Sequence, residues 1–406
     1  MTRLSKKVTA LMAAFYSISM AFAARTNFKG FSDKVCIDLP EGFKLENSSS
    51  DTSFQLQSTI APVHAVIQIY REGKYKGTED ALKTTVSKLG LQGNFDTFDW
   101  RNNKTCISLL NGNLMGVQSS GYGAAAVIPE NKSIILVLSW AEEKNAEAAG
   151  PYMCSLIDSI YVDIESYFSA GLLTSYTFPK KGAKDIKLKI DGKDISTKID
   201  ESDREASEYL IDREYQVLLM YQKSNLWKEA WQRYYRLIFR DSSERLLQAG
   251  FDITNALAPD CKDTTELAQK LLTWTQGFKY EREKTSSDFA SLPSILLGSG
   301  SDCDSRSMLI AVLLQGMKAD SIIFVSAEHS HAIVGLVSDH PGFGFNVNGK
   351  LYLTGETTAK DVTWGKIDSK QSDSSKWIPV TLPEKKGRPI SMSHCRAQHG
   401  NLLYCN

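Results

Sequence analysis

The sequence predicts an α+β protein with two folded domains. In the first 165 residues, short apolar runs with the near-alternating pattern of strands are interspersed with helical patterns. A polar stretch rich in Lys, Asp, Gly and Ser follows, and the rest of the chain begins with helical periodicity and continues with a buried helix and further strands. At 406 residues, of which 42% are apolar and 23% charged, the chain is long enough for two or three packed cores.

Residues 1–23 have the pattern of an export signal. Arg3, Lys6 and Lys7 form a basic start, an apolar run follows, and small residues at positions 21 and 23 fit a cleavage site. The apolar run is short for a membrane span, and an uncleaved anchor is the alternative interpretation. Because the chain is formally neutral, it has no charge excess that would favour nucleic acid. We therefore expect an exported protein, periplasmic or secreted, without nucleic-acid binding and without a stable membrane span after signal removal.

Residues 24–165 are expected to form the first α+β domain. The sequence PEG at positions 40–42 predicts a turn between the strands KVCIDL and VHAVIQIY. The motif TED at positions 78–80 opens a helix that runs to Lys88, because a capping residue and two acids stand in its first turn. Further strands are predicted at FDTFDW, TCISLL, GVQSSGYGAAAVI and SIILVLSW, and a closing helix over about residues 145–160.

The chain after residue 165 divides into a linker and a second domain. Residues 166–204 are predicted to be a linker, with IKLKIDGKDI as a candidate exposed hairpin. Residues 205–406 are predicted to form the second domain, and its first part is helical because apolar residues recur at spacings of three and four. This stripe consists of Ile211, Tyr215, Leu218, Leu219, Trp227, Trp231, Tyr235 and Ile238. Packing against a neighbouring domain is favoured over a nucleic-acid platform.

Cys303 stands at the predicted amino end of a central helix. The stretch LGSGSDCDSRSML places it between a glycine-serine turn and a run that is apolar nearly all round. Unpaired amide donors and the helix dipole favour a thiolate there, which predicts a thiol pKa below about 8.5, provided that Asp302 and Asp304 point away. A buried structural cysteine or a disulfide partner is the alternative interpretation.

A histidine and a carboxylate follow Cys303 on predicted strands. His331 belongs to the strand SHAIVGL, and Glu356 ends the strand LYLTGETT, so the three residues supply a nucleophile, a base and a group that orients the base. His329 is predicted on the same strand face as His331 and is the competing base. A metal site with His340 is a further alternative, but no cysteine-pair or His-Glu-x-x-His spacing supports zinc. No metal and no cofactor are therefore expected.

The region from about residue 264 to 370 resembles the transglutaminase-like branch of the papain-like cysteine hydrolases. The resemblance rests on GSGSDCDSRSMLIAVLL, HAIV and ETT, together with Trp274, Tyr280, Trp364 and Gly365. It implies a nucleophile at Cys303, a general base at His331 and the orienting carboxylate at Glu356. Two positions depart from the family pattern: Glu356 stands where aspartate is commoner, and Ile333 stands where an aromatic residue usually follows His-Ala.

The first domain resembles PsbP-like domains, which are small α/β/α modules of exported bacterial proteins. The resemblance rests on PEGFKL, the VIQIY strand, and the order of a helix, several strands and a closing helix. It implies binding or scaffolding without a common chemistry. Trp100 and Arg101 could form a ligand clamp, but a core position for the strand-end tryptophan is favoured.

These observations predict an exported cysteine-dependent acyl-transfer enzyme, a peptidase or amidase that acts on a protein or peptide substrate through Cys303, His331 and Glu356. An amine acceptor in place of water would give cross-linking. The alternative is a non-catalytic binding or assembly protein on the same scaffold. Cys395 and Cys405 are predicted to form a disulfide, and because the chain has seven cysteines, at least one thiol stays outside any intramolecular set.

Overall fold

The computed structural model describes residues 25–27, 35–50, 52–114, 116–282 and 287–383. The α+β class is confirmed, and the chain forms two compact units. The first unit contains residues up to Thr177 and Arg213–Tyr234, and the second contains Phe178–Asp212 and the chain from Tyr235 onward. The export signal at residues 1–23 and the predicted disulfide between Cys395 and Cys405 lie outside the described residues.

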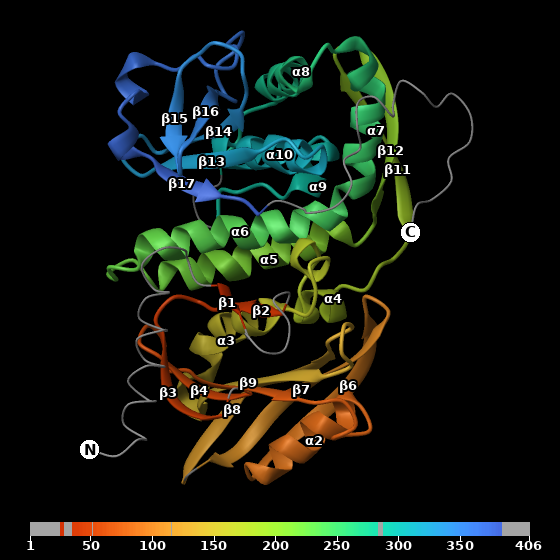
Figure 1. The fold of residues 1–406 in the computed structure, drawn as a ribbon, viewed down its shortest axis with the longest axis vertical. Coiled ribbons are helices and arrows are strands. Elements are labelled where there is room, and N and C mark those ends of the chain that lie inside the picture. Colours follow the sequence, from red (N-terminus) through yellow and green to blue (C-terminus); the bar gives the residue numbers. More distant parts are fainter. Residues whose placement is uncertain (1–24, 28–34, 51, 115, 283–286, 384–406) are drawn as a thin grey trace. The chain divides into compact units, whose positions relative to one another are not determined.

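The first unit is built around a seven-stranded antiparallel sheet (Figure 1). The strands in spatial order are β3 (Phe43–Ser50), β4 (Ser53–Ser58), β5 (His64–Tyr70), β9 (Ile134–Glu142), β8 (Val117–Val127), β7 (Asn103–Leu114) and β6 (Leu91–Trp100). Neighbouring residues of one strand belong to different cores: Ala125 lies in one hydrophobic cluster, and Ala124 and Ala126 lie in the other. This period of two buries both faces of the sheet.

One helix covers each face of this sheet. Helix α2 (Thr78–Lys88) has the predicted bounds, and its Leu82 and Val86 pack in the cluster that contains Ala125. Helix α3 (Glu143–Asp158) contributes Leu156 and Ile157 to the cluster on the other face. The first unit also contains β1 (Arg25–Asn27), β2 (Cys36–Asp38) and β10 (Ile160–Tyr161) in a small sheet, η1 (Ser166–Phe168) and α4 (Leu172–Thr177).

Two long helices follow the hairpin β11 (Ala183–Ile190) and β12 (Lys193–Asp200). Helices α5 (Asp203–Leu219) and α6 (Trp227–Arg245) each have residues in both units. The hairpin belongs to the second unit, where Ile186, Leu188 and Ile190 alternate with exposed residues and β12 packs on α7 (Leu247–Leu257). The segment 166–204, for which a linker is predicted, therefore holds a hairpin with one buried face.

The second unit contains a five-stranded antiparallel sheet and one central helix. The strands in spatial order are β15 (Gly344–Val347), β16 (Lys350–Gly355), β14 (His331–Val337), β13 (Ser321–Ser326) and β17 (Ile378–Thr381). Helix α10 (Cys303–Gly316) packs on β13 and β14. The remaining elements are η2 (Ala258–Asp260), α8 (Thr264–Gln276), α9 (Leu292–Leu296), η3 (Ser369–Gln371) and η4 (Ser374–Lys376).

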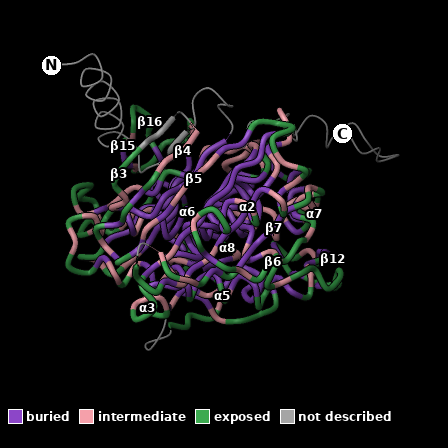
Figure 2. The backbone as a smooth tube through the Cα atoms, turned by 90° about the horizontal axis from the view of Figure 1, so that it is seen from below, coloured by how far each residue is buried: buried purple, intermediate pink, exposed green. Residues whose placement is uncertain are grey.

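Burial follows the secondary structure. Figure 2 shows buried residues along the strands and central helices, and exposed residues in the turns and on outer helix faces. In the stretches that the structure describes, we find no helix with both the length and the hydropathy needed to cross a membrane.

Candidate active site

Cys303 is the first residue of α10, as the sequence predicts. Asp302 caps the helix, since its Oδ1 accepts a hydrogen bond from the Ser305 amide at 2.9 Å. The preceding turn contains Gly298 at a φ of 94°, a conformation that a glycine adopts without strain. The helix behind Cys303 is buried nearly all round, and Cys303 itself is only 3% exposed. The turn therefore leads into a helix start that lies within the core of the second unit.

The surroundings of the Cys303 sulfur contradict the prediction of a lowered thiol pKa. The thiol donates to Asp304 Oδ1 at 3.5 Å, so this carboxyl group does not point away. Burial raises the thiol pKa, and Asp304 and Asp302 raise it further, while the Ala332 amide acts in the opposite direction. Desolvation and two neighbouring acids thus outweigh the helix end, and the resting group is a thiol.

Asp302 and Asp304 are themselves shifted towards their neutral forms. Burial raises the pKa of Asp302 to about 8, with a further contribution from Asp304, although the Ser305 side chain and amide oppose the rise. Burial likewise raises the pKa of Asp304. Two carboxylates beside a buried sulfur would repel each other, so the site favours the protonated form of Asp302.

The donor atoms of Asp302, Cys303 and Asp304 lie within 4.8 Å of one another, a spacing compatible with a metal ion. The positive end of the α10 dipole and the nearby Arg306 guanidinium disfavour a cation there. Acidic groups of this kind are common without an ion, so the cluster is the electrostatic environment of the thiol and supports no metal site.

His331 and Glu356 form a buried pair across neighbouring strands. His331 begins β14, and Glu356 directly follows β16, whose Gly355 is paired with Val334. His331 Nε2 lies 2.7 Å from Glu356 Oε2, and the two side chains are 12% and 11% exposed. The predicted strand that ends in Glu356 corresponds to β16, which ends one residue earlier, and the structure pairs this strand with that of His331.

Glu356 is held as a carboxylate. Its Oε1 accepts hydrogen bonds from the Thr358 amide at 2.7 Å and the Thr358 hydroxyl at 2.6 Å. Burial opposes ionisation, but the bond and charge of His331 and the two Thr358 bonds outweigh it and lower the pKa of Glu356 to about 2. An ionised carboxylate on Nε2 fixes the ring orientation of His331 and leaves Nδ1 for a second partner.

A cavity of about 620 Å³ lies beside this pair. His331, Glu356 and Thr358 line it, together with Asp361 and Lys366. This volume is in the range of ligand pockets. Cys303 is not among the lining residues, so the imidazole and carboxylate border the cavity while the sulfur is more deeply buried.

His329 is not part of the strand that carries His331, so its predicted position on that strand is wrong, although both rings pack on Trp377 and both residues line the same cavity. The turn before β14 includes Ser330 at a φ of 47°, and the strand begins only at His331. The His329 ring packs on Trp377, with ring centroids 5.5 Å apart. Within the described chain, its buried Nε2 atom has no hydrogen-bond partner. His329 lines the cavity, but Glu356 pairs with His331.

Tyr280 is a site residue to which sequence reasoning assigned no role, although it belongs to the transglutaminase-like resemblance. The segment around it pairs with the chain just before Cys303: the Glu281 amide donates to the Ser301 carbonyl at 3.1 Å, and the Ser301 amide donates to the Lys279 carbonyl at 3.0 Å. This pairing brings the phenol within hydrogen-bonding reach of the Cys303 side chain. Burial, followed by Cys303 and Asp302, raises the pKa of Tyr280 to about 12, so the phenol keeps its proton as a donor.

Three further thiols in the described chain provide a comparison. Cys106, Cys154 and Cys261 are free and buried, and burial raises the pKa of each. Cys261 lies in the second unit, where its thiol donates to the Leu257 carbonyl at 3.3 Å. It is a structural cysteine with which Cys303 can be compared.

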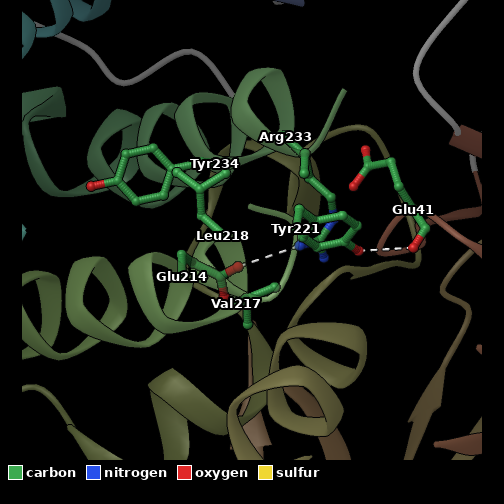
Figure 3. A pocket seen from close by; sticks show the side chains of 8 residues that line it. Glu41, Glu214, Val217, Leu218, Tyr221, Arg233 and Tyr234 are labelled. Carbon is green, nitrogen blue, oxygen red and sulfur yellow. Dashed lines mark hydrogen bonds and ion pairs between the residues drawn. The ribbon is translucent and has the colours of Figure 1, made fainter. Parts of the chain in front are cut away.

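A much smaller cavity lies in the first unit (Figure 3). It measures about 10 Å³, which is close to the space for one water molecule. The Tyr221 hydroxyl donates to the Glu41 carbonyl at 2.8 Å, and Arg233 Nη1 lies 3.3 Å from Glu214 Oε2. A space of this size holds no substrate, and its polar lining belongs to a buried ion-pair network.

Trp100, whose alternative role was a ligand clamp, is in the core. It is 3% exposed, and its Nε1 donates to the Ala170 carbonyl at 3.2 Å. Arg101 donates to Ser169 Oγ at 2.5 Å. Both side chains therefore connect β6 to the chain before α4, as the favoured interpretation predicts.

Comparisons with known proteins assign no family to the chain. It matches no family model and no curated protein. Among solved structures, it is similar to the Ran-binding protein Mog1p of Saccharomyces cerevisiae, at 9% identity over 36% of this chain and 99% of Mog1p, with a TM-score of 0.27. It is also similar to the cyanobacterial PsbP of Synechocystis sp., at 10% identity over 35% of this chain and 94% of that chain, with a TM-score of 0.28.

A third similar structure is a protein of Bacteroides thetaiotaomicron, at 9% identity over 54% of this chain and 78% of that chain, with a TM-score of 0.24. Identities and TM-scores this low carry no argument about function. A PsbP-like structure is thus among the neighbours of the chain, and the transglutaminase-like resemblance stays a prediction.

Proposed function

We propose that this chain is an exported cysteine-dependent acyl-transfer enzyme, most simply a peptidase or amidase. The observation that carries the proposal is the 2.7 Å contact between His331 Nε2 and Glu356 Oε2 at the wall of a cavity large enough for a peptide segment. A carboxylate partner of this kind orients a histidine that acts as general base and stabilises the imidazolium that forms.

In the proposed reaction, His331 Nδ1 takes the proton from the Cys303 thiol as the sulfur attacks an amide carbonyl carbon. The tetrahedral oxyanion is stabilised by the Cys303 amide at the helix start and by the Tyr280 phenol. His331 then gives its proton to the departing amine as the carbon–nitrogen bond breaks, which leaves a thioester. Water, deprotonated by His331, cleaves the thioester to an acid and restores the thiol.

Glu356 does not take the proton in this scheme. Its low pKa keeps it anionic, so it stabilises the imidazolium that forms at His331 and holds the ring with Nε2 towards itself. The extra methylene relative to aspartate is accommodated by the two Thr358 hydrogen bonds, which fix the far oxygen.

A second candidate is a binding protein that keeps this scaffold without turnover. It is favoured by the 3% exposure of Cys303, by its raised thiol pKa, and by its absence from the cavity lining. In this case a segment of another protein would occupy the cavity beside His331 without covalent chemistry.

One experiment separates the two functions. The protein is incubated with a peptide library, and products are read by mass spectrometry for wild type, Cys303→Ala, His331→Ala and the matched control Cys261→Ala. The enzyme proposal expects cleavage by wild type and the Cys261 variant and none by the other two. Peptides that wild type and the two cysteine variants bind equally but never cleave would support the binding function.

A further inference from the structure

Arg306 lies one helical turn after Cys303, on the central helix of the second unit. It is 1% exposed, and it is among the largest side chains in the described chain that are fully buried. Arginine is seldom buried unless its five donors and its charge have partners. The partners of Arg306 therefore indicate what the side chain does.

The guanidinium group connects three segments that carry site residues. Its Nε donates to Ser301 Oγ at 3.0 Å, and its Nη2 donates to the Ser301 carbonyl at 3.3 Å, just before the helix start. Its Nη1 donates to the Thr357 carbonyl at 3.3 Å, next to Glu356. A further Nη2 bond, at 2.9 Å, reaches the Phe278 carbonyl, two residues before Tyr280.

All of these acceptors are neutral. Among the residues that the structure describes, no carboxylate forms an ion pair with Arg306. Arg245 in the same unit differs, because it contacts Asp203 and Asp241 at 2.8 Å each. Arg306 instead stacks near aromatic rings, with its guanidinium carbon 5.4 Å from the centre of the Tyr280 ring. Its positive charge is solvated by dipoles and rings and is not cancelled by an anion.

The groups that interact electrostatically with the Arg306 charge belong to the candidate site. Burial lowers the Arg306 pKa, while Tyr280, Asp302, Cys303 and Glu356 act in the opposite direction. Of these groups, Cys303 is the one that gains a negative charge in the proposed reaction. A buried cation that is not already neutralised offsets part of the desolvation cost of that thiolate.

We propose that Arg306 is a positioning residue that holds Cys303, Glu356 and Tyr280 in one arrangement and supplies the buried positive charge that stabilises the Cys303 thiolate. This inference rests on the proposed function, because a Cys303 thiolate is required only if Cys303 is the nucleophile. The planar set of guanidinium donors accounts for the positioning, and the positive charge accounts for the electrostatic effect. Different substitutions of Arg306 can therefore test the two roles separately.

The test uses the full-length protein and iodoacetamide, with alkylation of Cys303 followed by peptide mass spectrometry as a function of pH. Arg306→Gln removes the charge and is expected to move the alkylation profile to higher pH, which lowers the rate at neutral pH about tenfold. Arg306→Lys keeps a charge and is expected to retain most of the wild-type profile. The matched control, Arg245→Gln, removes a buried arginine from the same unit and is expected to leave the alkylation profile of Cys303 unchanged. Near-UV circular dichroism shows whether each variant is folded.

The outcomes are distinct for the two proposals. An Arg306→Gln protein that is folded and has the wild-type alkylation profile overturns the electrostatic role, whether or not peptides are cleaved. If that variant does not fold, Arg306→Lys decides the positioning role: peptide hydrolysis reduced about tenfold or more with the alkylation midpoint retained supports it, and wild-type hydrolysis overturns it. If the alkylation profile of Cys303 depends on Arg306 but the protein cleaves no peptide, the electrostatic role is supported and the proposed enzymatic function is contradicted.

Discussion

His331 Nε2 and Glu356 Oε2 are joined by a 2.7 Å contact at the point where β14 begins and β16 has just ended. Because the two strands are hydrogen-bonded neighbours, the sheet itself sets the separation of the two side chains. The imidazole orientation thus depends on a rigid element rather than on a loop.

Replacement of Glu356 by Gln should remove stability at neutral pH. The folded pKa of about 2 lies below the ordinary value of 4.5, so the ionised Glu356 stabilises the fold above about pH 4.5. This contribution is lost as the pH falls towards 2. We expect the free energies of unfolding of wild type and Glu356→Gln to differ by on the order of 2 kcal/mol at neutral pH and to converge in acid. Chemical denaturation at several pH values measures this.

The control for that series is Glu328→Gln, which removes a carboxylate of the same unit that is 60% exposed and paired with Lys376. Exposed pairs contribute about 0–1 kcal/mol. If the free energies of unfolding of the two variants fall equally at every pH, the pair of His331 and Glu356 contributes no more stability than an exposed ion pair.

Replacement of Asp304 by Asn should make Cys303 more reactive. Asp304 Oδ1 accepts a hydrogen bond from the Cys303 thiol at 3.5 Å, and Asp304 raises the thiol pKa. Loss of this carboxylate should therefore shift the alkylation profile of Cys303 to lower pH. A shift of one unit corresponds to about tenfold faster alkylation at neutral pH. Iodoacetamide kinetics by peptide mass spectrometry measure the shift, with Cys261 in the same digest as the internal control. An unchanged Cys303 profile would mean that burial alone sets its pKa.

Replacement of Asp302 by Asn should flatten the pH dependence of stability. With a folded pKa of about 8 and an ordinary value of 3.8, Asp302 keeps its proton in the folded state while the unfolded chain loses it. Stability therefore falls as the pH rises from about 4 to about 8. Asn retains the cap and has no such titration, so we expect it to be the more stable protein at the upper end, by on the order of 2 kcal/mol.

Thermal denaturation between these pH values compares the Asp302 variant with wild type. The control is Asp373→Asn, which changes another capping aspartate, one that is exposed and accepts from the Ser375 amide at 3.0 Å. This control should keep the wild-type slope. Parallel slopes for wild type and the Asp302 variant would contradict the buried protonated acid.

Replacement of Gly355 by Ala should disturb the strand end that carries Glu356. The added Cβ would lie 2.7 Å from Trp364 Cζ3 and 2.9 Å from Val334 Cγ1, which is too close in a packed core. Overpacking of this kind costs about 1–3 kcal/mol, and peptide cleavage should fall with it. Gly316→Ala, at the end of α10 with nothing within 4 Å of the added carbon, should be neutral or slightly stabilising. Equal melting temperatures for both variants would refute the packing argument.

Local patterns in the sequence were sufficient for the elements that carry the site. The acidic first turn predicted α2, although its N-cap is Gly77 and no side chain caps it as expected, and the polar turn followed by an apolar run predicted the start of α10 at Cys303. Short apolar runs predicted the strand of His331 and the strand before Glu356, whereas β15 between them and the pairing of β14 with β16 are known only from the structure. The predicted features depend on residues that are close in the chain.

Features that depend on distant residues were not predictable in this way. No local rule indicates that Tyr280 lies near Cys303 or that Arg306 contacts three separate segments. The left-handed Ser330, which removes His329 from the strand, is likewise set by the turn geometry of the folded sheet. The expected division at residues 166–204 differs from the observed units because the hairpin there has its own apolar face.

The division of the first unit into two sequence segments has a consequence for synthesis on the ribosome. Asp158, 2% exposed, accepts from Arg213 Nη1 at 2.6 Å, and Ser155 donates to Glu214 at 2.7 Å. When the seven-stranded sheet has been translated, the cation that neutralises Asp158 is still more than fifty residues away in the nascent chain. A buried carboxylate without its cation is costly. The amino-terminal segment would therefore remain incompletely folded, and accessible to chaperones, until the ribosome has passed Tyr234.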